Sequence, residues 1–155
     1  MFTRLSTAVL LVASSLQAQQ GAVPLYKDLG THRKAIGSPV PLAQQYFDQG
    51  LRLVYGFNHA EAIRSFTRAT ELDPACAMCW WGIAYAYGPH VNAGMDSASG
   101  VKAYEAAQKA LSLSSNASAW KRAYIRAVAA RYAQRGPSVE FATASAQIEC
   151  ARTPP

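Results

Sequence analysis

Apolar residues that recur at intervals of three and four most strongly restrict how this chain can fold. They form five successive segments within residues 42–135, each ending at glycine, proline or a serine–asparagine run. Alternating runs of β-branched residues, which would indicate strands, are missing from the sequence. The periodicity therefore predicts an all-α domain of short helices over residues 42–135.

Small and aromatic residues within these segments recur at the spacing of a repeated helix pair. Five residues of the stretch 43–76 fall on a 34-residue pattern: Gly50, Ala62, Phe66, Ala69 and Pro74. A second unit opens 34 residues further on, with Trp80, Ile83, Ala84 and Tyr87 at matching positions. This pattern resembles the tetratricopeptide repeat (TPR), although Tyr46, Gln49 and Leu53 replace the usual Trp, Leu and Tyr.

The second unit departs from the family pattern after residue 87. About seven extra residues lie within 88–98, and Ser115 replaces the closing proline. The resemblance implies tandem antiparallel helix pairs in a TPR-like α-α solenoid, with about two repeats plus an extra helix near 118–134. Gly50, Ala62, Ala69 and Ala84 would then lie where helices approach most closely. A generic antiparallel helical bundle is the alternative.

The ends of the chain lack this periodicity. Residues 1–18 combine Arg4, an apolar stretch at 8–13 and a small residue at Ala18, which predicts a cleaved signal peptide and an exported protein, periplasmic or secreted. An N-terminal anchor helix is the alternative, but the apolar stretch is too short to span a bilayer. Residues 19–41 are rich in glycine and proline and predict an extended lead-in, and residues 136–155 form a poorly patterned tail.

The formal charge of +6 arises from 15 Lys and Arg against 9 Asp and Glu. Five of the basic residues lie within 121–135 at helical spacing, which is typical of a solvated face. Because exported proteins rarely meet nucleic acid, the charge predicts solubility and not a nucleic-acid partner. We also expect no stable membrane insertion after signal cleavage.

Cys76 and Cys79 form the sequence's single C-x-x-C motif. In an exported protein this spacing favours a local disulfide. A thiol–disulfide enzyme is an alternative, but no strand pattern precedes the motif as a thioredoxin-like site requires. A copper or zinc site completed by His90, with Met78 or Met95 as soft ligands, is a further alternative. The spacing of His90 does not define a zinc site.

The resemblance also implies where a partner would bind. In TPR proteins the first helix of each pair lines a concave groove, whose outward positions here would be Gln44, Phe47, Leu51, Val54, Met78, Trp81 and Tyr85. Such a groove suits a peptide or protein partner. The alternative is that Phe47 and Trp81 are covered by the lead-in or by further repeats. The sequence contains no recognisable catalytic or cofactor-binding motif, so we expect a binding protein and not an enzyme.

Overall fold

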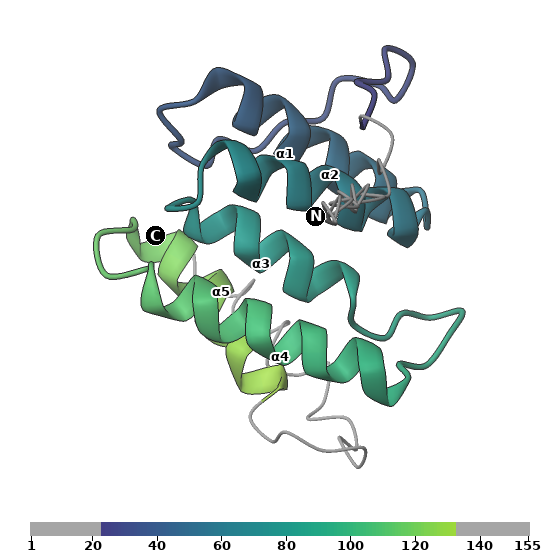
Figure 1. Cartoon of the computed structure of the whole chain (residues 1–155), viewed down its shortest axis with the longest axis vertical. Helices are drawn as coiled ribbons and strands as arrows, with labels where there is room; N and C mark the ends of the chain where they lie inside the picture. Colours follow the sequence, from purple (N-terminus) through teal and green to yellow (C-terminus); the bar gives the residue numbers. More distant parts are fainter. Residues whose placement is uncertain (1–22, 133–155) are drawn as a thin grey trace, which may run out of the picture.

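Five α-helices make up the part of the chain that the computed structural model describes, residues 23–132 (Figure 1). They are α1 (Pro41–Tyr55), α2 (His59–Leu72), α3 (Ala77–Ala86), α4 (Ser97–Ser112) and α5 (Ala119–Arg131). The predicted signal peptide and the tail after residue 135 lie outside the described residues. None of the described helices is long and apolar enough to cross a membrane.

Local sequence signals explain where these helices begin. Pro41 opens α1, where its missing N–H costs no hydrogen bond. Asn58 caps α2 by accepting from the Glu61 N–H, and Asp96 caps α4 by accepting from the Ser99 N–H at 2.8 Å. The Cys76 sulfur occupies the same capping role for α3, at 3.1 Å from the Cys79 nitrogen.

The helices pack as antiparallel pairs, which confirms the predicted all-α class. Helix α1 packs against α2, and α3 packs against α4, while contacts between α2 and α3 join the two pairs (Figure 1). Helix α5 packs on both α3 and α4. Helices α1, α3 and α5 thereby lie next to one another in that order, and we call the side they form the α1–α3–α5 face.

Phe66 of α2 fills the junction between the two pairs. Its side chain is fully buried between Gly50 of α1 and Gly82 of α3. A Cβ atom added at either glycine would lie within 2.6 Å of the Phe66 ring. The predicted role of a small residue at a close helix approach is thereby confirmed at Gly50, and Ala62, Ala69 and Ala84 are fully buried.

The loop between α3 and α4 is folded onto the rest of the domain. His90 and Ala93 exchange two backbone hydrogen bonds, and the His90 ring stacks on His59 with centroids 4.1 Å apart. The Arg131 guanidinium donates to the Pro89 carbonyl at 2.8 Å. The extra residues of the second unit therefore connect the first helix pair with α5.

Candidate functional site

The lead-in packs against α1 in two limbs, and the first limb comprises residues 23–26. The buried Gln49 side chain accepts from the Tyr26 N–H at 2.8 Å and donates to the Pro24 carbonyl at 2.9 Å. The Tyr46 hydroxyl donates to the Val23 carbonyl at 2.8 Å. These bonds satisfy polar groups that burial would otherwise penalise, so this limb is firmly anchored.

The second limb, residues 32–36, lies along α1 in the opposite direction, and we call it the strap. The Gln44 amide accepts from the Ile36 N–H at 2.9 Å and donates to the Lys34 carbonyl at 3.0 Å. Asp48 accepts from the Lys34 N–H at 3.0 Å. Arg52 donates to the His32 carbonyl at 2.8 Å. All four hydrogen bonds are made to the backbone of the strap.

The three contacting side chains of α1 are spaced to match an extended chain. Gln44, Asp48 and Arg52 are four residues apart, which places them about 6 Å apart along one face of a helix. Alternate residues of an extended strand are about 6.6 Å apart and turn their backbone groups to the same side. A ladder at this spacing can therefore hold any extended segment by its backbone, whatever its side chains.

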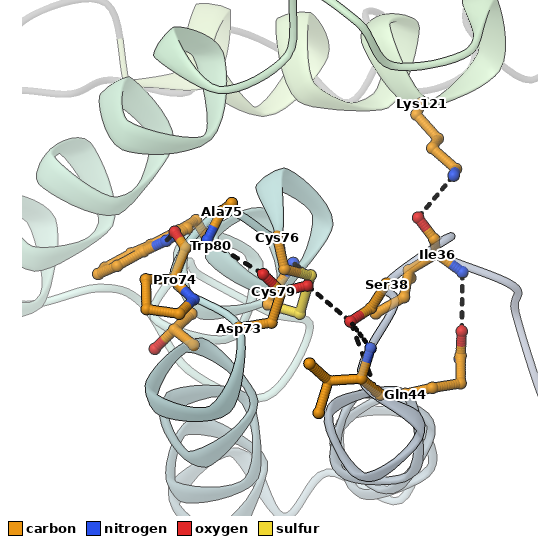
Figure 2. Close-up of a disulfide and its surroundings, with 12 residues drawn as sticks. Ile36, Ser38, Gln44, Asp73, Pro74, Ala75, Cys76, Cys79, Trp80 and Lys121 are labelled. Carbon is orange, nitrogen blue, oxygen red and sulfur yellow. Dashed lines mark hydrogen bonds between the residues drawn. A yellow bond between two sulfur atoms is a disulfide. The ribbon is translucent and has the colours of Figure 1, made fainter.

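Side chains of the strap connect α1 to α5, which do not pack directly against each other. The Lys34 ammonium lies over two α5 rings, 4.5 Å from the Trp120 centroid and 4.7 Å from the Tyr124 centroid. The Lys121 ammonium donates back to the Ile36 carbonyl at 2.5 Å (Figure 2). Ile36 is 6% exposed and belongs to the apolar core. The strap thus fills the space between these two helices.

Ser38, two residues after the strap, lies beside the turn between α2 and α3. The Ser38 hydroxyl donates to the Asp73 carboxylate at 2.6 Å (Figure 2). Asp73 also accepts from the Ala75 N–H, and its backbone carbonyl accepts from the Cys76 N–H. This connection attaches the segment after the strap to the turn that leads into α3.

A tyrosine cluster on the α1–α3–α5 face remains accessible beside the strap. Tyr55 is 58% exposed, and Tyr85 and Tyr124 are half-buried. Burial raises the pKa of the Tyr55 phenol, and the nearby phenols of Tyr85 and Tyr124 raise this pKa further. Each of the three helices contributes one of these tyrosines, so the cluster spans the α1–α3–α5 face.

The sequence predicted that seven groove residues are accessible, and this prediction is wrong for five of them. Phe47, Leu51, Val54, Met78 and Trp81 are at most 6% exposed, whereas Gln44 and Tyr85 are half-buried. Helix α5 covers Trp81, whose indole N–H donates to the Tyr124 carbonyl at 3.1 Å. The Phe47 and Trp81 rings pack together with their centroids 6.5 Å apart. Phe47 and Trp81 are therefore buried, as the alternative expected, but α5 covers Trp81 in place of the lead-in or a further repeat.

Cys76 and Cys79 form a disulfide at the start of α3 (Figure 2). Cys79 is fully buried and Cys76 is 7% exposed, which disfavours attack by an external thiolate. His90 follows the opposite end of α3, a ten-residue helix about 15 Å long, so it does not complete a metal site with these cysteines. Within residues 23–132 no group of three or more His, Cys, Asp and Glu residues could hold a metal ion.

We expect loss of the disulfide to reduce stability modestly. The crosslink closes a loop of only four residues, for which the chain-entropy relation gives about 2 kcal/mol. The Cys76→Ser, Cys79→Ser variant should lose about that much free energy of unfolding in urea denaturation. Serine at 76 keeps a side-chain cap for α3. A Cys150→Ser background prevents intermolecular disulfides, and equal stability of both proteins would contradict a stabilising role.

Comparisons of the chain with protein-family models, curated proteins and solved structures give no match.

Several residues of this site were absent from the sequence-based prediction. They are Lys34 in the strap, Asp48, Arg52 and Tyr55 in α1, and Trp120 and Tyr124 in α5. One signal was present: polar residues at 44, 48 and 52 repeat every four positions along a helix that is otherwise amphipathic. Such a polar row indicates that the face meets polar groups, but it does not identify them.

Proposed function

We propose that the protein is a non-catalytic scaffold of the TPR type that binds an extended polypeptide on its α1–α3–α5 face. An exported location is supported by residues 1–18, which combine the basic Arg4, an apolar stretch and a small residue at Ala18. The 34-residue spacing of small and aromatic residues supports the TPR assignment.

The observation that carries this proposal is the backbone ladder of α1. Gln44, Asp48 and Arg52 hold the strap through its amide and carbonyl groups, at distances of 2.8 to 3.0 Å. Recognition of an extended segment through its main chain is a general way for proteins to bind peptides. This face therefore already makes, within one molecule, the kind of contacts that a peptide partner requires.

The tyrosine cluster supplies the accessible part of the binding face. Tyrosine offers a large apolar ring together with a hydroxyl group, and it is enriched at protein interfaces. Tyr55 and Tyr124 lie on α1 and α5, the two helices that flank the strap, and Tyr85 lies on α3. A partner bound here would contact these rings without unfolding the domain.

Site-specific crosslinking in cells that produce the protein tests this proposal. A photoreactive phenylalanine analogue at Tyr85 should give a discrete crosslinked product with a partner. The matched control is the same substitution at Tyr104, a half-buried tyrosine of α4, which is outside the α1–α3–α5 face. We expect the yield at Tyr104 to be at least tenfold lower. Equal products at both positions, or none at Tyr85, would contradict the proposed face.

A further inference from the structure

We propose that the strap is an exchangeable internal ligand. The site between α1 and α5 would also take, from a partner protein, an extended segment with lysine followed two residues later by a branched aliphatic residue. This inference deepens the proposed function, on which it rests, by giving the chemical class of the bound segment.

The side-chain contacts of the strap define that class. The Trp120 and Tyr124 rings meet edge to face. The Lys34 ammonium lies over one face of each ring, at less than 5 Å from each ring centroid. A cation placed over aromatic rings in this way is attracted by their negative faces. Ile36, two residues later, is the one strap residue whose side chain is buried. Lysine and the aliphatic residue therefore carry the specificity, whereas the α1 ladder carries the backbone contacts.

Arg33 contributes less to this recognition. Its guanidinium lies 3.3 Å from the buried Asp48 carboxylate, but the Arg33 side chain itself is 70% exposed. An ion pair with one exposed partner adds little binding free energy, because water screens the attraction between the two charges. Ala35 is exposed as well. A competing segment is therefore free to vary at these two positions.

The way the strap is attached permits exchange. Gly30 and Gly37 lie on either side of it, with φ values of 81° and 76° that favour glycine. Glycine rotates easily between backbone conformations, so both ends can act as hinges. Only Ile36 contributes buried apolar surface between the hinges. A segment with so little buried surface can detach locally while the helices remain folded.

A peptide in solution tests whether the site exchanges its occupant. The probe is a fluorescent, capped peptide with the sequence of residues 31–38, Thr-His-Arg-Lys-Ala-Ile-Gly-Ser. The Lys34→Ala, Ile36→Ala variant of the full chain should bind it at least tenfold more tightly than the wild type, because its own strap competes less. Fluorescence anisotropy measures the affinity, and circular dichroism checks the fold. Peptides with alanine at the lysine, or aspartate at the isoleucine, should bind at least tenfold more weakly.

Absence of peptide binding to the folded variant would overturn the inference, and so would equal binding of a scrambled peptide. If the variant does not fold, hydrogen exchange on the wild type decides instead. The Lys34 and Ile36 amides should exchange at least 100-fold faster than the core amides of α3, and exchange only through global unfolding would overturn the proposal. Crosslinking at Tyr85 without peptide binding would refute this ligand class and leave the proposed binding face intact.

Discussion

Replacement of Trp81 by alanine should lower the free energy of unfolding by about 3–5 kcal/mol, the range for large buried aromatics. The Trp81 indole is 6% exposed, stacks on Tyr85 and donates to the Tyr124 carbonyl. Its removal would leave a cavity between α3 and α5 and would remove the hydrogen bond that the indole donates to α5. Urea denaturation followed by circular dichroism measures the loss.

Trp80 is the matched control for this prediction, one residue earlier on the same helix. Its side chain is only half-buried, and its indole N–H donates to the Pro74 carbonyl at 3.1 Å. We expect Trp80→Ala to cost only about 1–2 kcal/mol, from one hydrogen bond and partial packing. A larger loss for Trp80→Ala than for Trp81→Ala would show that the assigned phase of α3 is wrong.

Phe66→Ala should cost about 3–5 kcal/mol, because this ring joins the two helix pairs. The ring is fully buried and lies against the backbones of Gly50 and Gly82. Gly82→Ala should cost about 1–3 kcal/mol in the wild type, since its Cβ would lie 2.5 Å from the ring. The ring cannot retreat, because Gly50 confines it as well.

The same Gly82→Ala substitution should reverse its effect when made together with Phe66→Ala. Without the ring the new methyl group has space, and alanine favours a helix over glycine by about 1 kcal/mol. The double-mutant cycle should therefore give a coupling of about 2 kcal/mol or more, measured in the same denaturation experiment. If Gly82→Ala is stabilising in the wild type, Phe66 does not lie against this glycine.

The amino-acid sequence by itself determined where the helices lie and which of them pair closely. Helix α2 begins at His59 after the Asn58 cap and ends at Leu72, before Asp73–Pro74. These signals are local, since a cap or a proline acts on residues within one turn of helix. Small residues also act locally, because their size alone decides how closely two helices can approach.

Only the tertiary structure decided which apolar residues remain accessible. Helix α3 packs against all four other helices and has hardly any polar side chains, so its sequence could not show that Trp81 is buried and Trp80 is partly exposed. The cover over Trp81 comes from α5, which is distant in the sequence from α3. Phe47 of α1 is buried against Phe66 of α2 and Trp81 of α3. Burial depends on which surfaces meet in space, and periodicity along one helix carries no information about the segment that will lie across it.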